Sequence, residues 1–449
     1  MTQSLDPSCD DSLHVTGYAP LNGPMDDDAT LDAVQRAAFE YFLTHTHPRN
    51  GLVADTSRAG APASIAVVGF ALSVYPVGVE RGWISRADAA LRSLRAMRFF
   101  GTCDQTDVAV ANGHRGFFFH FLDMDSGARV WESELSMIDS ALLIAGVLTA
   151  ATYFAADNDV ERELRDLADT IYRRVDWRWA QRDGGAVAHG WKPQSGFLHY
   201  GWDGYSEALL LYVLGLASPT HALTDHSYHA WTLTYQWENL YGHEFLYAGP
   251  LFIHQFSHAW IDFRGIRDRF MRAKDCDYFE NSRRASQAHR EYAIRNPRGF
   301  AGYGEDCWGL SAGDGPHTLP RRIDGRYQAF YGYTARGIPF GPDDGTIAGS
   351  AALCSLVFAP DIVWPMVRRL VAEAGPPDYR LLRAGGFNRT LCDGAGSSPW
   401  VTPDVGGLEQ GMIVLMIENY RSDLPWKLGR SNPYIVAGLG RAGFTGGWL

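Results

Sequence analysis

Cysteine is scarce in this sequence, and its six residues are widely spaced. No C-x-x-C pair and no zinc-ligand spacing occurs, so neither a zinc ribbon nor a dithiol redox centre is expected. No uninterrupted apolar run reaches the roughly 18 residues of a membrane-spanning helix. The N-terminus has neither a basic segment nor an apolar core, so no Sec signal is recognised. A cytoplasmic protein is expected from the chain as given, and a periplasmic or secreted one if a signal was removed.

Basic residues are fewer than acidic ones: the sequence has 40 Lys and Arg and 51 Asp and Glu, which gives a net charge of −11. Nucleic-acid surfaces need clustered cations, so neither nucleic acid nor a membrane is expected as a partner. Aromatic residues, by contrast, make up 13% of the chain and include 14 Trp. Their rings stack on the C–H faces of sugars. A neutral carbohydrate therefore suits this composition better than an anionic ligand.

Helical periodicity begins at Thr30, after a polar stretch rich in Pro, Gly and Asp. We expect residues 1–28 to form a flexible tail. Two kinds of helical segment then alternate along the chain. Segments such as 137–154 are apolar on nearly every side, whereas segments such as 161–175 carry one apolar stripe. This alternation predicts hairpins that pair a buried inner helix with an amphipathic outer helix.

Capping boxes mark the starts of two expected outer helices, Ser85 with Asp88 and Asn158 with Glu161. About a dozen helices can be counted in this way, which favours an all-α fold, an (α/α)6 barrel of helical hairpins. No period-2 run predicts a large sheet, and no linker-like segment divides the chain. We therefore expect residues 29–449 to form one barrel domain.

The segment 196–216, GFLHYGWDGYSEALLLYVLGL, joins an aromatic and glycine-rich loop to an apolar helix. It places Asp203 and Glu207 among Trp202 and Tyr205. Glycosidic bonds are cleaved by paired carboxyl groups, and aromatic rings hold sugars beside them. The alternative interpretation is a buried aromatic loop in which Asp203 only caps the helix. Residues from this segment are candidates for both catalysis and substrate binding.

Three acids stand where apolar helices are expected to begin: Asp139 in SMIDSALL, Glu207 in YSEALLLY and Asp404 in TPDVGG. Inner helices of a hairpin barrel point the same way, so their N-termini gather at one rim and the acids can converge. Asp139 could instead be the acid of a capping box three residues after Ser136, and Asp404 an N-cap, both of which the helix dipole favours. Glu207 lies beyond the capping positions, so capping explains it less well.

An acid and a base for glycoside hydrolysis need different surroundings. Aromatic neighbours would keep the Glu207 carboxyl protonated, which suits a general acid. Asp139 and Asp404, at positive helix ends, suit a base or an electrostatic partner. Glu132 and Glu134 lie close to Asp139 in the sequence and remain alternatives.

His254, His258 and Asp262 fall at positions i, i+4 and i+8, which would place them on one helical face. The motif lacks the H-E-x-x-H arrangement of a zinc enzyme, so we expect sugar hydroxyls rather than a metal as partners. No metal and no cofactor is expected. Further aromatic and acidic loops follow, although glycine and Asp are also typical of turns. The substrate-binding candidates are Trp202, Asp203, Tyr205, Glu134, His254, Glu305, Trp308 and Asp344.

The chain resembles the glycoamylase-like domain family, which includes bacterial endo-β-1,2-glucanases of glycoside hydrolase family 144. The resemblance spans nearly the whole chain and rests on long segments: SELSMIDSALLIAG, HYGWDGYSEALLLYVLGL, YGHEFLYAGPLFIHQFSHAWIDFRGIRD, FAGYGEDCWGLSA, GPDDGTIA and GLEQGMIVLMIENYRS. It implies an (α/α)6 barrel acting on β-1,2-glucan or its oligosaccharides. Carried over by motif, it implies catalytic roles for Glu207, Asp139 and Asp404. A transglycosylase on the same substrate and a catalytically silent glucan-binding protein are the alternatives.

Overall fold

The computed structural model describes residues 26–323, 325–392 and 398–449. Most of the expected tail, residues 1–25, lies outside the described residues. Helix α1 (Asp27–Thr44) already begins at Asp27. The Asp26 carboxylate caps it by accepting hydrogen bonds from the backbone N–H groups of Asp28 and Ala29.

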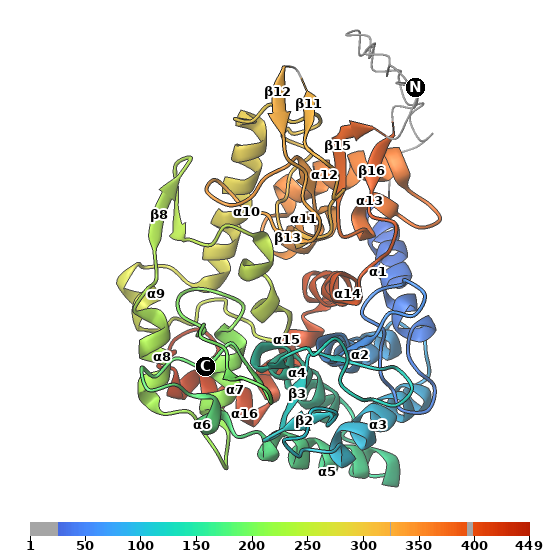
Figure 1. Ribbon diagram of the computed structural model, residues 1–449, viewed down its shortest axis with the longest axis vertical. Helices are drawn as coiled ribbons and strands as arrows, with labels where there is room; N and C mark the ends of the chain where they lie inside the picture. Colours follow the sequence, from blue (N-terminus) through green and yellow to red (C-terminus); the bar gives the residue numbers. More distant parts are fainter. Residues whose placement is uncertain (1–25, 324, 393–397) are drawn as a thin grey trace.

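The protein is an (α/α)6 barrel, as the alternation of helical segments predicted. Apolar elements, buried on nearly every side, form its inner ring. They are α2 (Ile65–Glu80), α4 (Met137–Tyr153), α7 (Leu209–Ala217), the 3-10 turns η1 (Leu251–His254) and η2 (Phe256–Ala259), α11 (Gly349–Cys354) and α14 (Gly407–Ser422). Helix α2 packs on α4, α4 packs on α7, α11 packs on α14, and α14 closes the ring against α2. Figure 1 shows α14 near the centre of the view, between α11 and the α2–α4 pair.

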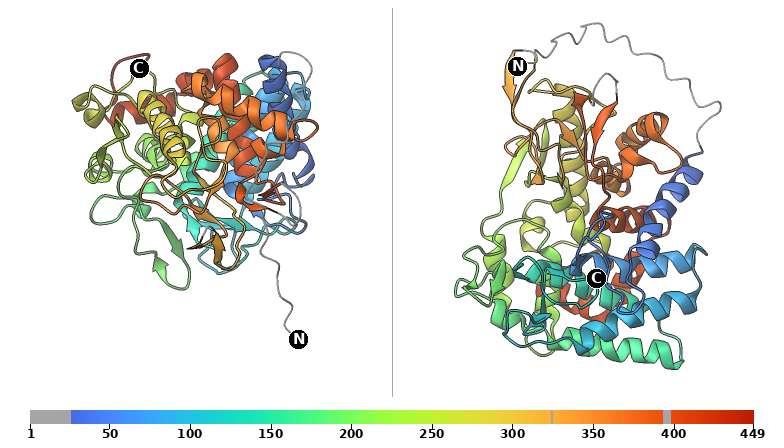
Figure 2. Two further views of the ribbon diagram at one scale, coloured as in Figure 1. Left: turned by 90° about the horizontal axis from the view of Figure 1, so that it is seen from above. Right: turned by 45° about the vertical axis from the view of Figure 1, so that its right-hand side comes forward.

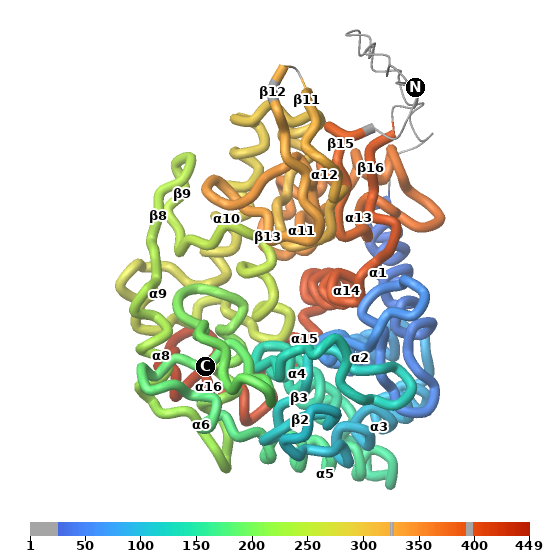
Figure 3. Tube along the Cα trace, in the orientation of Figure 1, coloured from blue at the N-terminus to red at the C-terminus, as the bar shows by residue number. Residues whose placement is uncertain are grey.

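Amphipathic helices cover this ring from outside. They include α1, α3 (Arg86–Thr102), α5 (Asp159–Arg174), α8 (Asp225–Thr232), α10 (Tyr278–Arg295) and α12 (Pro360–Ala374). The predicted capping positions are confirmed, because the Ser85 hydroxyl accepts from the Asp88 N–H and the Asn158 side chain accepts from the Glu161 N–H. In Figure 3 the colours pass around the ring in chain order, from α1 to α12.

Short antiparallel strands gather on one side of the molecule, away from most of the helices (Figure 2, left). The largest sheet has the order β2–β3–β5–β6–β7. Its strands are β2 (Gly113–His114), β3 (Phe117–Phe119), β5 (Leu135–Ser136), β6 (Gly190–Lys192) and β7 (Gly196–Phe197). A second sheet joins β14 (Thr346–Ile347), β15 (Phe387–Cys392) and β16 (Pro399–Val401). Strands of two or three residues carry too little alternation to be predicted from sequence.

The remaining strands form two-stranded pairs. These are β1 (Ala63–Ser64) with β4 (Phe121–Leu122), β8 (Trp237–Leu240) with β9 (His243–Leu246), β10 (Ala312–Gly313) with β13 (Thr334–Ala335), and β11 (Arg321–Ile323) with β12 (Arg326–Gln328). Two strands run directly into inner helices: β1 ends where α2 begins, and β5 ends where α4 begins. The strand layer thus lies at the rim where inner helices start, and it positions the side chains of that rim.

The other end of the ring is covered by C-terminal helices. Helix α15 (Leu424–Ser431) packs on α4, and α16 (Pro433–Arg441) packs on α7. Short helical turns complete the structure: α6 (Trp177–Ala180), α9 (Arg269–Ala273), η3 (Ser355–Val357) and α13 (Arg380–Arg383). No helix within the described ranges has both the length and the apolar character needed to cross a bilayer.

Candidate active site

A cavity of about 850 Å³ opens at the strand-covered rim of the barrel. Asp139, Glu207 and Asp404 all line it, so the expected convergence of the three acids is observed. Its other polar lining comes from segments far apart in the chain: Asp55, His120, Glu134, His189, Gln255, Asp314, Tyr333 and Glu409. Inner helices that start at one rim bring these residues together.

Glu207 lies in the turn before α7 and keeps some exposure to the cavity. Its backbone carbonyl accepts a hydrogen bond from the Ser257 hydroxyl at 3.2 Å. The same hydroxyl accepts from the Leu210 N–H at 3.1 Å, so η2 fixes the turn against α7. Burial raises the pKa of Glu207 to about 7, and the negative charge of Asp139 adds to this effect. The carboxyl can therefore hold a proton near neutral pH, as a general acid must.

His120 lies between two carboxylates on the same wall. Its Nδ1 is 3.0 Å from Oε1 of Glu134, and its Nε2 is 3.5 Å from Oδ2 of Asp139. Burial alone would lower the pKa of His120, but the charge of Asp139 and the hydrogen bond to Glu134 raise it to about 9. The same hydrogen bond lowers the pKa of Glu134 to about 2. At neutral pH the pair is an imidazolium with a carboxylate, and Asp139 faces its positive charge.

Asp139 occupies the first turn of α4, where Ser136 is the N-cap. The Ser136 hydroxyl accepts from the Asp139 N–H at 3.2 Å and is hydrogen-bonded to the Asp139 carboxylate. The cap of this helix is thus the serine. The Asp139 carboxylate lines the cavity beside His120, which leaves it available for chemistry.

Asp404 lies two residues before the N-cap of α14, which is Gly406, so it does not cap that helix. Its Oδ2 accepts from the Arg58 Nε at 2.9 Å. The backbone around Arg58 is joined to the same segment, since the Ser57 N–H donates to the Val405 carbonyl at 2.9 Å. The Ser57 hydroxyl accepts from the Val405 N–H at 3.0 Å. These contacts hold Asp404 at the cavity wall.

Three further acids, Asp55, Asp314 and Glu409, also line the cavity. The sequence interpretation did not single them out. Burial raises the pKa of Glu409 to about 7, and the charges of Asp55 and Asp314 add to it. Burial likewise raises the pKa of Asp55 to about 6, against the opposing charge of His120. A Cβ at Gly406 would overlap Oε2 of Glu409, so the glycine makes room for the carboxyl. Glu409 lies inside the GLEQG motif quoted above, and this motif is the sequence signal that could have identified it as a site residue.

The residues proposed from the segment 196–216 have different locations. Trp202 lines the cavity and stacks on His189, with ring centroids 4.1 Å apart. Tyr205 does not line it; its ring packs against those of His254 and Tyr278. Asp203 is exposed outside the cavity lining, and α7 has no side-chain cap within the described structure. The capping role considered for Asp203 is therefore not observed.

The expected helical face of His254, His258 and Asp262 is corrected by the structure. The histidines lie in the separate 3-10 turns η1 and η2, not on one α-helix. His254 is 1% exposed, and its Nε2 is 3.1 Å from the Ala248 carbonyl oxygen. Asp262 is paired with Arg264 at 2.8 Å. Neither histidine lines the cavity, so the expected contacts with sugar hydroxyls are not available to them.

The candidates from the later aromatic loops also lie outside the cavity lining. Trp308 is 1% exposed in the core. Glu305 is exposed and lies 3.2 Å from Arg290. Asp344 is fully buried and accepts two hydrogen bonds from Arg336, at 2.7 and 2.9 Å. The structure therefore does not bring these three substrate-binding candidates to the cavity.

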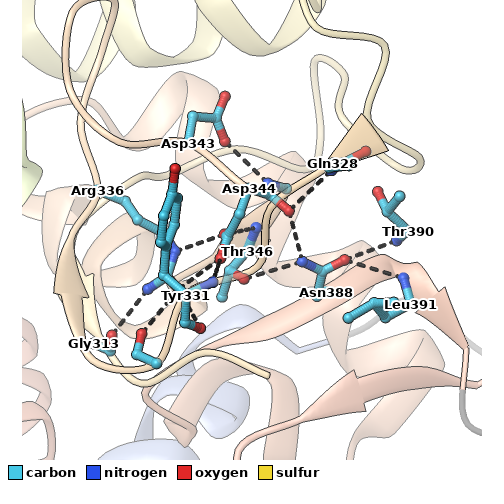
Figure 4. A network of polar contacts seen from close by, with 12 residues as sticks. Gly313, Gln328, Tyr331, Arg336, Asp343, Asp344, Thr346, Asn388, Thr390 and Leu391 are labelled. Carbon is cyan, nitrogen blue, oxygen red and sulfur yellow. Dashed lines mark hydrogen bonds and ion pairs between the residues drawn. The ribbon is translucent and has the colours of Figure 1, made fainter. Parts of the chain in front are cut away.

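Figure 4 shows what Asp344 holds in place. Its carboxylate also accepts from the backbone N–H groups of Tyr331 and Thr346, at 2.9 and 3.1 Å. Its backbone carbonyl accepts from the Asn388 side chain at 2.9 Å. The network ties the loop between β12 and β13, and the start of β14, to β15. Tyr333, on that loop, lines the cavity.

Comparison with known proteins gives a consistent result. Residues 199–433 match the model of the Glycoamylase family. The fold resembles that of a glucoamylase-like protein from Bacteroides uniformis ATCC 8492 with a TM-score of 0.83 and 30% identity, over 95% of this chain and 100% of that chain. An endo-β-1,2-glucanase from Chitinophaga pinensis, in complex with sophorotriose and glucose, has a TM-score of 0.79 and 26% identity, over 95% of this chain and 100% of that chain.

Among curated proteins, an exo-β-1,2-glucooligosaccharide sophorohydrolase acting at the non-reducing end, from Parabacteroides distasonis, is 28% identical over 457 residues. The match covers 93% of this chain and 58% of the relative, so the chain spans less than two thirds of that relative's length. The helical ring, the acid-lined cavity at its rim and the family match agree, and the chain belongs to the glycoamylase family.

Proposed function

We propose that this protein is a glycoside hydrolase that cleaves β-1,2-glucosidic bonds in β-1,2-glucan or its oligosaccharides. The observation that carries the proposal is the arrangement of carboxyl groups in one cavity. Burial raises the pKa of Glu207 to about 7, and its cavity is shared by Asp139, from the first turn of α4, and by Asp404, from the loop before α14. Hydrolysis of a glycosidic bond needs one protonated and one ionised carboxyl in a single site.

In the proposed reaction Glu207 donates its proton to the glycosidic oxygen as the bond to the anomeric carbon breaks. A water molecule adds to that carbon and loses a proton to Asp139 or Asp404. Each of these two has a cationic neighbour, His120 for Asp139 and Arg58 for Asp404. Trp202 at the cavity wall offers an aromatic surface for a sugar ring.

The choice of linkage is supported by the relatives. One of them is a sophorohydrolase and another an endo-β-1,2-glucanase that holds sophorotriose and glucose. The cavity volume of about 850 Å³ suits an oligosaccharide rather than a single small metabolite. Acid chemistry and cavity size alone would fit several neutral glucans.

Incubation with linear β-1,2-glucan tests the proposal. New reducing ends and short sophoro-oligosaccharides are expected, and β-1,3- and β-1,4-glucans serve as controls for the linkage. A product series of many lengths would indicate endo action, whereas sophorose alone would indicate release from a chain end. The absence of new reducing ends would exclude a hydrolase.

Two other outcomes would support the alternatives. Redistribution of chain lengths without a net gain of reducing ends would indicate a transglycosylase. Binding of sophoro-oligosaccharides without any turnover would indicate a glucan-binding protein.

A further inference from the structure

A second cavity, of about 460 Å³, adjoins the first. The two share a ridge formed by Arg58, Gly60, Ala61, Pro62 and Trp131, which line both. The second cavity continues beyond this ridge to the end of α1 and the turn after β4, where Thr44, Thr46, His47 and Asp125 line it. Its volume lies within the ~300–1,000 Å³ of typical ligand sites. The proposed catalytic acids Asp139, Glu207 and Asp404 line only the first cavity. Arg58, on the ridge, forms an ion pair with Asp404.

Trp131 stands on this ridge in an unusual conformation. The residue is 71% exposed, and its φ of 58° is followed by a φ of 49° at Glu132. Two consecutive left-handed residues with side chains are costly, and such strain concentrates at functional sites. A large apolar ring held in water on a strained backbone contributes little to the core. A stacking surface for a ligand explains both features.

The turn that carries Trp131 is held firmly by its neighbours. The Arg129 guanidinium donates to the carbonyl oxygens of Glu132 and Ser133, at 2.7 and 2.6 Å. The Ser133 N–H donates back to the Val130 carbonyl at 3.0 Å. The Trp131 ring itself rests against Phe121, with centroids 5.2 Å apart. The exposed ring is therefore pre-positioned, so little conformational entropy is lost when a ligand stacks on it.

The chemistry of the second cavity suits a neutral polyol. Its lining combines both signs of charge with Thr44 and Thr46, whose hydroxyls donate to the Glu40 and Phe42 carbonyls. His47 Nε2 lies 3.2 Å from Oδ1 of Asp125, whose carboxylate is largely exposed. Among the described residues, the Nδ1 of His47 has no hydrogen-bond partner. Balanced donors and acceptors favour sugar hydroxyls over an anion or a cation.

We propose that the second cavity is a distal glucan-binding site that takes the further glucosyl units of a long chain, which crosses the ridge by stacking on Trp131. This inference rests on the proposed function, because the chain must be a substrate held in the first cavity. It adds that long chains bind more tightly than short ones through contacts remote from the reacting bond. Remote contacts of this kind raise affinity for a polymer without taking part in the chemistry.

Binding measured against chain length tests the proposal. In a Glu207→Gln background, which prevents turnover, calorimetry gives dissociation constants for β-1,2-glucooligosaccharides of increasing length. Trp131→Ala should weaken the binding of long oligosaccharides by about tenfold or more and leave the shortest bound oligosaccharide nearly unaffected. Thr44→Trp, which fills only the second cavity from the exposed end of α1, should have the same effect. Tyr327→Ala removes an exposed ring that lines neither cavity and should change nothing.

The outcomes separate this inference from the proposed function. Equal weakening of short and long chains by Trp131→Ala would place the tryptophan in the first cavity only and overturn the proposal. An unchanged length dependence in Thr44→Trp would overturn it as well. If the wild-type protein cleaves short oligosaccharides without any preference for longer ones, the distal site is excluded but the proposed hydrolase function stands. If the wild-type protein neither cleaves nor binds β-1,2-glucan, both the distal site and the proposed function are excluded.

Discussion

The imidazole of His120 and the carboxylate of Glu134 lie 3.0 Å apart, from Nδ1 to Oε1. This pairing follows from the strand layer, because the backbone N–H of His120 donates to the backbone carbonyl of Glu134 at 3.0 Å. The antiparallel alignment of β3 with β5 therefore fixes both side chains at one level of the rim. The second ring nitrogen of His120 is left facing Asp139.

His120→Gln should destabilise the protein most between about pH 4.5 and 6.5. The folded pKa of His120 is raised to about 9, so its contribution is full below its ordinary value of 6.5 and is lost as the pH rises toward 9. The pKa of Glu134 is lowered to about 2, so its contribution is full above its ordinary value of 4.5 and is lost toward pH 2. Urea denaturation should show a loss of about 1 to 2 kcal/mol at pH 5.5, because both side chains are partly exposed.

At pH 9.5 the same variant should differ little from wild type, because His120 is then largely neutral in the folded protein. An equal loss of stability at both pH values would mean that the ring acts through packing alone.

Glu207→Gln should lower turnover of β-1,2-glucan by about 10²-fold or more, because the amide keeps the shape of the side chain but cannot deliver a proton. Folding and oligosaccharide binding should persist. The measurement compares initial rates with thermal unfolding on one preparation. Near-wild-type turnover would remove Glu207 from the mechanism, and a fall in stability with intact activity per folded molecule would make it a structural residue.

The activity of the wild type should decline as the pH rises through about 7, because the pKa of Glu207 is raised to that value and the proposed general acid must be protonated to act. Glu409 has a similarly raised pKa, so the assignment needs a matched variant. In Glu409→Gln the decline should remain at the same pH. Its disappearance in that variant would assign the titration to Glu409 instead.

Glu409→Gln should stabilise the protein at pH 8 and leave its stability nearly unchanged at pH 4.5. The pKa of Glu409 rises from 4.5 to about 7 on folding, so stability from this group is full below pH 4.5 and is lost as the pH rises through 7. An amide stays neutral and avoids that loss. Chemical denaturation should show a gain of about 1 to 2 kcal/mol at pH 8, after allowance for partial exposure to the cavity. A destabilised variant at pH 8 would show that the carboxylate has a favourable partner.

Asp344→Asn should cost about 3 to 5 kcal/mol of stability, because it leaves the buried Arg336 guanidinium without its counter-charge. Glu305→Gln is the matched control, since it breaks an ion pair whose carboxylate is exposed and should cost less than about 1 kcal/mol. Neither change should alter KM for short oligosaccharides in the folded protein. A tenfold rise in KM for Glu305→Gln would return Glu305 to the substrate site, whereas the same rise for Asp344→Asn would show that its network positions Tyr333 at the cavity.

The sequence by itself determined the helical ring and much of its acid set. Apolar segments such as 137–154 have no polar face, so they could only be inner helices, and the capping residues marked where helices start. The sequence also predicted that Asp139, Glu207 and Asp404 share one site, because residues near the starts of inner helices lie at the same rim. Composition within a loop was a weaker signal. It selected Asp344 and Trp308, which point into the core rather than into the cavity.

Only the tertiary structure decided the environment of each acid. His120, Glu134 and Asp139 become neighbours through strands too short to carry a pattern, and Asp55 reaches Glu409 from the opposite end of the chain. The pKa of a carboxyl group depends on the water and charges within a few ångströms of it. The charged neighbours of Glu409 come from segments hundreds of residues apart, and those of Asp139 meet it only through strand pairing. Local sequence can therefore propose the acids, but only the folded ring sets which of them hold a proton.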